Sequence, residues 1–173
     1  KLAKPYHNIN ESVDGGLLDL AKRSKVFDNF VADVVAALLD GTLNNAVVNG
    51  ISKSAWADTV KAANDAYQPG KFTTFAGYEF TSSTEERESI HRNVIFRGAE
   101  RLPAQPCSKP NSANPEGLWD WMDALRGQGI ESLAIPHNSN GSNGAMFAFT
   151  DWAGNAIDQE YADQRLRNEP LVE

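Results

Sequence analysis

The chain has 173 residues, 41% hydrophobic and 23% charged, which is the length and composition of one globular domain with a sizeable core. Its 23 acidic residues outnumber its 16 basic residues and give a net charge of −7, which argues against a nucleic-acid partner because such partners select basic surfaces. No apolar stretch approaches the roughly 20 residues of a membrane-spanning helix, so we expect no membrane partner either.

Both ends of the sequence have the character of interior segments. The chain begins KLAKPYHNIN, with no initiator methionine and no signal-peptide pattern, and it stops soon after Leu171 and Val172, which resemble the start of another element. We therefore expect an internal part of a longer protein, and the missing targeting signal leaves its compartment open. The single cysteine, Cys107, excludes an intrachain disulfide and a cysteine-rich zinc site.

The first 53 residues are predicted to be mainly helix and loop. Apolar residues recur between Leu17 and Leu39 with three-and-four spacing towards the end of that range, which predicts at least one helix ended by Gly41. Residues 41–50 are rich in turn-forming residues and indicate a connection. A second helix is expected from Ser54, a suitable N-cap, to Tyr67.

Two strands follow in the predicted order. Residues 71–81 read KFTTFAGYEFT and residues 89–98 read SIHRNVIFRG, both rich in residues that favour strands. About ten residues separate the two strand cores, too few for a parallel crossover, so residues near 72–81 and 90–97 should form an antiparallel hairpin.

The remaining elements alternate between helix and strand. A helix is predicted from Pro115 to the glycines near residue 129, a strand over residues 132–136, a polar loop after it, and a last helix over about residues 158–168. This mixture indicates an α/β fold.

Three side chains with ligand chemistry should meet at one edge of this sheet. Glu79 is near the end of the first strand and His91 near the start of the second, so an antiparallel hairpin brings them to the same edge. His137 ends the third strand, and the chain between residues 96 and 132 is long enough for that strand to return parallel to the first. Two imidazoles and a carboxylate can bind zinc, manganese or iron and leave a position for water or substrate.

Each of these residues also has a purely structural interpretation. A histidine at a strand end can simply be hydrogen-bonded, and Glu79 could form a salt bridge with Arg87 or Arg92. Arg92 alternates away from His91, and it could bind a phosphate group or pair with an acid. His7, in a polar N-terminal segment, is interpreted as structural only.

Several segments together resemble a known family. The blocks GKFTTFAGYEFTSS, IHRNVIFRG, LAIPHNSNGSNGAMF and YADQRLRNEPLVE are similar to the middle of a bacterial family catalogued as domain of unknown function 3604. That family is similar to the PHP (polymerase and histidinol phosphatase) superfamily of metal-dependent phosphoesterases. The resemblance covers residues 54–173, interpreted as the central part of a PHP-like domain, while residues 1–53 match only in helical character.

The resemblance implies a distorted β/α barrel with a multinuclear site of divalent transition metals in the full protein, a site of which this segment holds only a part. In such a site Glu79 would bridge two metals, and His91 and His137 would be ligands of one of them. Asn138 and Asn140 would contact substrate or orient the ligands, and Arg92 joins them as a candidate substrate-binding residue. The compartment would be bacterial, either periplasm or cytoplasm.

The sequence also departs from the pattern of such sites. Phe80 and Ile90 replace an expected Trp and Leu, and the His-x-His, Asp-His and Asp-x-His segments are missing, which places them before Lys1 and after Glu173. We therefore expect a partial, barrel-like sheet of about three to five strands, with helices on one side. Its open edges should be covered by loops or should pair with a second copy of the chain.

The function that this implies is a segment of a metal-dependent hydrolase. The reaction would be hydrolysis of a small phosphoester by metal-activated water, with the segment alone incomplete and inactive. The alternative is a non-catalytic module that binds a ligand such as a glycan and whose histidines are structural.

Overall fold

A computed structural model describes residues 25, 28–29, 32–34, 36–37, 42, 45–86, 88–108 and 111–173 of the chain. The chain divides into two compact units, Lys1–Ile51 and Ser52–Glu173. The described residues between 25 and 37 are all helical, as the spacing in that region predicts. The rest of that predicted helix lies outside the described residues, and so does His7.

Helix α2, Asn45–Ala66, begins much earlier than the sequence indicated. The predicted connection over residues 41–50 is wrong from Asn45 onward, and Ser54 lies inside the helix rather than at its N-cap. Asparagine and Gly50 lower helix propensity without preventing a helix, since a glycine costs only about 1 kcal/mol relative to alanine. Trp56, 5% exposed, packs into the core with Val60 and holds the later turns of the helix in place.

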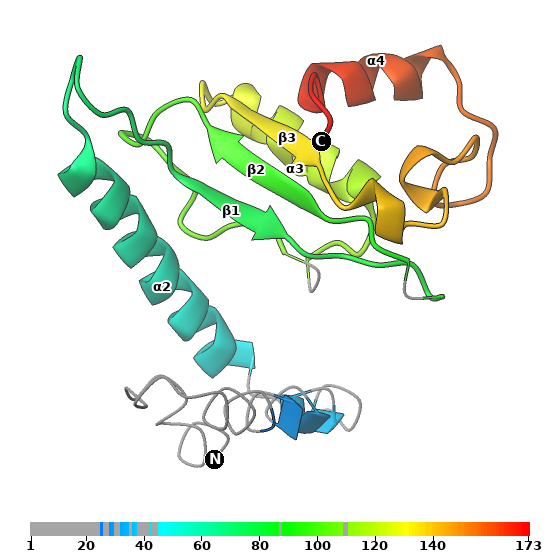
Figure 1. The fold of residues 1–173 in the computed structure, drawn as a ribbon, viewed down its shortest axis with the longest axis horizontal. Coiled ribbons are helices and arrows are strands. Elements are labelled where there is room, and N and C mark those ends of the chain that lie inside the picture. Colours follow the sequence, from blue (N-terminus) through cyan, green and yellow to red (C-terminus); the bar gives the residue numbers. More distant parts are fainter. Residues whose placement is uncertain are drawn as a thin grey trace. The chain divides into compact units, whose positions relative to one another are not determined.

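Three short strands form one antiparallel sheet in the order β1-β2-β3 (Figure 1). They are β1 (Gly77–Phe80), β2 (Arg92–Phe96) and β3 (Ser132–Pro136). The β1–β2 hairpin is confirmed, and β3 runs parallel to β1 as predicted, because both strands pair antiparallel with β2. Strand β1 is shorter than expected, since Phe72 and Phe75 before it are more than half exposed instead of packing on the sheet.

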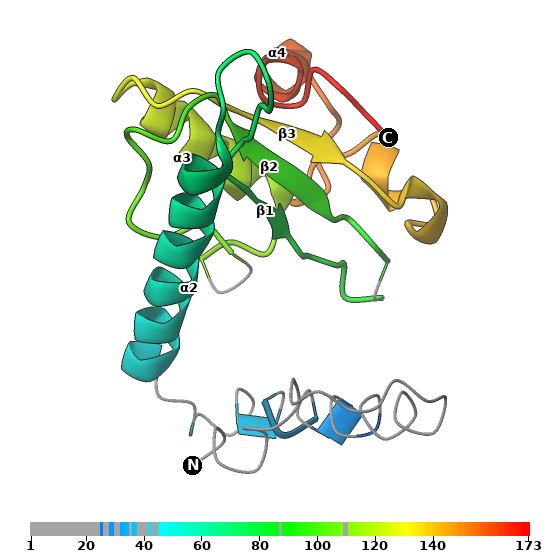
Figure 2. The same ribbon diagram turned by 60° about the vertical axis from the view of Figure 1, so that its left-hand side comes forward.

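One face of the sheet carries the core. Helix α3 (Pro115–Arg126) lies across that face in both ribbon views (Figure 1, Figure 2). Its buried Leu118 and Met122 belong to one apolar cluster with Phe80, Val94 and Ala134 of the three strands. The opposite face is only partly covered within the described residues. The side chains there belong to Glu79, Asn93, Ile95, Leu133 and Ile135.

The two C-terminal helices begin where the sequence predicts. Asn114 caps α3, where its side chain accepts a hydrogen bond from Gly117 N at 2.8 Å, and Pro115 occupies the first turn. Asp158 caps α4 (Gln159–Asn168), which contacts both α3 and β3. Between β3 and α4 lie two short 3₁₀ turns, η1 (Ser139–Gly141) and η2 (Ala145–Phe147).

The architecture is therefore a mixed helix and strand fold with a three-stranded antiparallel sheet. Such a sheet is compatible with a barrel segment and with an open sheet, so the barrel remains a prediction, as does pairing of its edges with a second copy. No helix among the described residues has the length and apolar character needed to cross a bilayer.

Candidate metal centre

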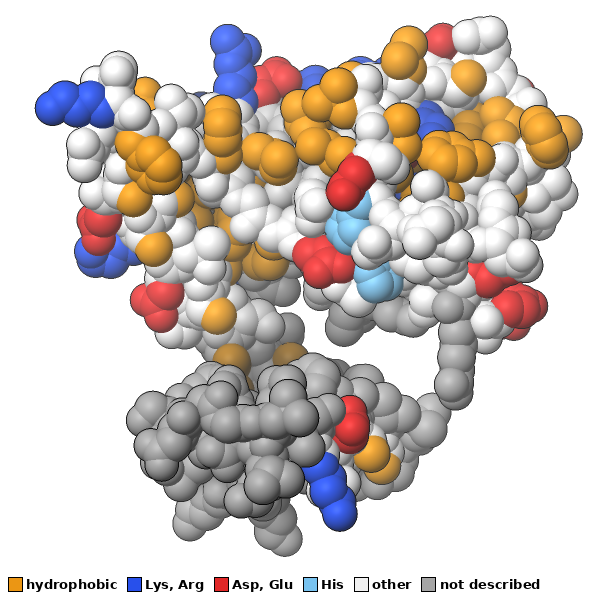
Figure 3. Space-filling view, in the orientation of Figure 1, with side chains coloured by type: hydrophobic (Ala, Val, Ile, Leu, Met, Phe, Trp, Pro, Cys, Tyr) orange, Lys and Arg blue, Asp and Glu red, His pale blue; other side chains and the backbone are white. Residues whose placement is uncertain are grey.

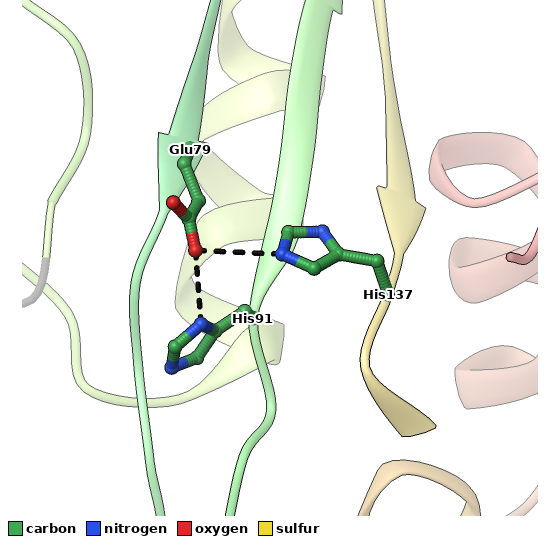
Figure 4. Close-up of side chains that lie close together, drawn as sticks. All are labelled: Glu79, His91 and His137. Carbon is green, nitrogen blue, oxygen red and sulfur yellow. Dashed lines mark ion pairs between the residues drawn. The ribbon is translucent and has the colours of Figure 1, made fainter. Parts of the chain in front are cut away.

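The side chains of Glu79, His91 and His137 converge at one edge of the sheet (Figure 4). Glu79 Oε1 lies 2.9 Å from His91 Nδ1 and 3.4 Å from His137 Nε2. One ligand atom from each residue lies within 4.8 Å of the other two. The convergence predicted from strand spacing is thus present in the fold.

Strand register brings these residues together. Glu79 pairs with Asn93, and Asn93 pairs with Ile135, so these three positions share the open face of the sheet. His91 is two residues before Asn93 and His137 is two residues after Ile135, which places both imidazoles on that face as well. The backbone N–H of His137 donates to His91 O at 3.2 Å, which keeps the two strands together at the site.

Two of the distances between ligand atoms suit a single metal ion. Ligand bonds of 2.0–2.2 Å in a tetrahedral site place neighbouring ligand atoms about 3.4 Å apart, close to the two distances from Glu79 Oε1. The side chain of His137 is 10% exposed and that of Glu79 is 45% exposed. The site is therefore closed on the His137 side and open to solvent on the Glu79 side. Figure 3 shows the two described histidines in pale blue at the surface. Such a centre leaves room for a water molecule or a substrate atom.

The same geometry also permits a hydrogen-bonded cluster that holds no metal. Each imidazole can donate an N–H to Glu79 Oε1, which would make the carboxylate a shared hydrogen-bond acceptor. His137 Nδ1 is buried without a hydrogen-bond partner in the described parts of the chain, whereas a metal-bound imidazole usually donates that N–H to an acceptor. The three donor atoms therefore fit a metal, but His137 Nδ1 lacks the hydrogen bond that usually orients a metal-bound imidazole.

Cys107 does not add to this donor set. Its side chain is buried in the core cluster, away from the open face of the sheet that carries the triad. Burial raises the pKa of the Cys107 thiol to about 11, so the thiol stays protonated at neutral pH and is a poor ligand.

The loop after His137 is fixed against the segment before His91. Ser89 N donates to Gly141 O at 3.1 Å, and Asn143 Nδ2 donates to Glu88 Oε1 at 2.9 Å. Asn138 and Asn143 have φ angles of 58° and 49°, left-handed conformations that asparagine tolerates better than most residues. The asparagines therefore allow the backbone conformation of this loop. The contact between Glu88 and Asn143 could not be predicted from the sequence, because no spacing rule connects these positions.

Asn138 and Asn140, the two candidate substrate-binding asparagines, are exposed at the start of this loop. Their side-chain amides are therefore accessible to solvent, and both residues closely follow His137 in the sequence. Their proposed contact with substrate stays a prediction.

Arg92 points away from the triad and pairs with an acid. Its Nε lies 2.6 Å from Glu169 Oε1, the two side chains are each 1% exposed, and its Nη1 donates to Ile90 O. This geometry matches the interpretation that Arg92 pairs with an acid, and the acid is Glu169 rather than Glu79. Its role in substrate binding stays a prediction. Arg87, the other suggested partner of Glu79, lies outside the described residues.

Comparison with known families gives a match over the whole chain. A family model described as "Protein of unknown function (DUF3604)" matches residues 1–173. The match includes the first 53 residues, so it extends further than the resemblance noted from residue 54 onward. Comparisons with curated proteins and with solved structures found no match.

Proposed function

The chain belongs to the DUF3604 family of proteins of unknown function, and we propose that it is part of a metal-dependent phosphoesterase. The observation that carries this proposal is the cluster of Glu79, His91 and His137, whose ligand atoms lie within 4.8 Å of one another. The reaction class is proposed from the resemblance of the family to PHP phosphoesterases, and this resemblance is itself part of the proposal.

The donor types indicate which ions would bind. Two imidazole nitrogens and one carboxylate oxygen form a borderline set that suits zinc, manganese or iron better than calcium or magnesium, which prefer oxygen ligands alone. A bound ion would polarise a phosphoryl oxygen and lower the pKa of a coordinated water molecule. In a multinuclear centre, the exposed carboxylate of Glu79 would be the bridging group.

The residues around the centre would then position a small phosphoester. The side-chain amides of Asn138 and Asn140 can donate hydrogen bonds to phosphoryl oxygens that face solvent. The hydrogen bond from Ser89 N to Gly141 O would keep this loop, and with it the amides, at a fixed distance from the triad.

An assay with reconstituted metal tests the proposal. A generic phosphomonoester, p-nitrophenyl phosphate, and the diester bis(p-nitrophenyl) phosphate are offered to the chain and to the longest natural polypeptide that contains it, with zinc or manganese. We expect the longer polypeptide to hydrolyse an ester only with metal, and the chain alone to show little activity. In the longer polypeptide the rate should fall at least about a hundredfold in Glu79→Gln and be unchanged in the control His7→Ala.

Two results would reject the proposal. One is hydrolysis that persists in Glu79→Gln at the natural rate. The other is a longest natural polypeptide that contains stoichiometric metal yet hydrolyses neither ester, and glycan binding by that inactive protein would support the non-catalytic alternative.

A further inference from the structure

A cavity of about 410 Å³ lies beside β2, and the proposed metal centre does not use it. Its walls come from residues 84–86, Ile90 and Arg92, from the first turn of α3, from six of the residues between 145 and 152, and from Tyr161 of α4. The volume is within the range of small-molecule sites, about 300–1,000 Å³. Ile90 and Arg92 line it, and their side chains alternate with His91, so the cavity is on the opposite side of this segment from the triad.

The charged groups that line the cavity are mostly acidic. Four of them are carboxylates, belonging to Glu85, Glu86, Glu116 and Asp151. The cationic residue among the described lining residues is Arg92, and Glu169 and the Ile90 carbonyl already bind its guanidinium. The uncompensated charge of the lining is therefore negative, which favours a cationic ligand.

Two aromatic side chains complete the walls. Trp152 is 43% exposed although it lines the cavity, and Tyr161 lines it from α4. Tyr161 is held edge-on against the buried Trp119, with ring centroids 5.2 Å apart. Aromatic faces attract organic cations more strongly than they attract hydrated inorganic ions, so the rings favour an organic cation over a simple metal ion.

Glu116 provides a specific acceptor within this lining. Its Oε1 accepts the backbone N–H of Trp152 at 3.0 Å. Its Oε2 is buried and has no hydrogen-bond partner among the described residues. A buried carboxylate oxygen without a donor is costly. Because Glu116 lines the cavity, a rotation of its carboxylate would bring Oε2 to an N–H group of a ligand there, and that hydrogen bond would remove the cost.

From these observations we infer that the cavity binds a small protonated amine with an apolar body. The ammonium group donates to Glu116 Oε2, and the apolar body packs against Trp152 and Tyr161. This site is independent of the metal centre and would persist in a protein whose triad had been removed.

Calorimetry with three matched probes tests the inference. Benzylammonium carries charge and N–H donors, benzyltrimethylammonium carries charge alone, and benzyl alcohol carries neither charge nor ammonium. The titrations use the full chain in EDTA at constant salt, in the His137→Ala background and without it. We expect saturable binding of one benzylammonium per chain in both backgrounds, weaker binding of benzyltrimethylammonium, and no saturable binding of benzyl alcohol.

Two variants locate the bound amine. Glu116→Gln keeps the oxygen that accepts from Trp152 N and removes the charge, and we expect it to weaken benzylammonium binding about tenfold or more. Trp152→Leu should weaken it a few-fold. Glu160→Gln is the matched control, because Glu160 is the acid in the first turn of α4 as Glu116 is in α3, and it does not line the cavity. Circular dichroism checks that each variant is folded.

The inference is overturned if benzylammonium shows no saturable binding, if benzyl alcohol binds equally well, or if the Glu116→Gln and Glu160→Gln variants lose binding equally. If benzylammonium binding disappears only in the His137→Ala background, the amine binds at the triad, and the cavity is not its site.

Discussion

The carboxylate of Glu169 is the clearest case of a single residue on which other groups depend. It accepts hydrogen bonds from Arg92 Nε at 2.6 Å, Trp119 Nε1 at 2.8 Å and Arg165 Nε at 3.2 Å. These donors come from β2, α3 and α4. Because Arg92 is adjacent to His91, this buried network also fixes the strand segment from which His91 projects.

We predict that Glu169→Gln destabilises the fold by about 3 kcal/mol or more, since it leaves the buried Arg92 guanidinium without its counter-charge. Urea denaturation followed by fluorescence measures this loss. The matched control is Glu160→Gln, an exposed change in α4, the helix that Glu169 directly follows, and it should alter the unfolding free energy by less than about 0.5 kcal/mol. Equal stabilities of the two variants would mean that the network contributes nothing.

At the scale of secondary-structure elements, Asp123 joins α3 to α4. Its carboxylate binds Arg167 at 2.7 Å and 3.1 Å, Asn168 at 3.1 Å, and Arg126 on its own helix. Hydrogen bonds from Arg167, Asn168 and Gln164 lower the pKa of Asp123 to about 2, Arg167 having the largest effect. The ionised form is therefore stabilised by the fold.

The pH dependence of this contact follows from its sign. A carboxyl group whose pKa is lower in the folded state stabilises that state above its ordinary pKa of 3.8, and the stabilisation is lost as the pH falls towards 2. We predict that Asp123→Asn lowers the unfolding free energy by about 1–2 kcal/mol at pH 6 and by almost nothing at pH 2.

Urea unfolding at a series of pH values tests this prediction. Asp58→Asn, at an exposed position of α2, is the control and should cost little at any pH. A constant difference between Asp123→Asn and the natural chain from pH 6 to pH 2 would exclude the charge as its cause.

At the scale of the whole molecule, local pattern predicted the sheet edge better than it predicted the distant contacts. Glu79 and His91 could be placed together because hairpin geometry and side-chain alternation act over a few residues. The partner of Arg92 could not be predicted, because Glu169 is 77 residues away and no pattern links the two. The start of α2 at Asn45 could not be predicted, because the asparagines and Gly50 in this segment are typical of turns, although each lowers helix propensity by only about 1 kcal/mol or less.

The cavity beside β2 was likewise beyond sequence reasoning. Its walls come from four separate segments, and Glu116 alone has the pattern of an ordinary acid in the first turn of a helix. Only the fold brings that carboxylate near Trp152 and Tyr161.

Zinc titration of the metal-free chain tests the central claim most directly, because the three proposed ligands come from three different strand ends. We predict one zinc ion per chain in the natural protein and in the His7→Ala control, with affinity reduced at least about tenfold in His91→Ala and in His137→Ala. Zinc should also raise the unfolding free energy, by about 2.7 kcal/mol at a hundredfold excess over the dissociation constant. Unchanged zinc affinity in His137→Ala, or no zinc bound by the natural chain, would contradict the account.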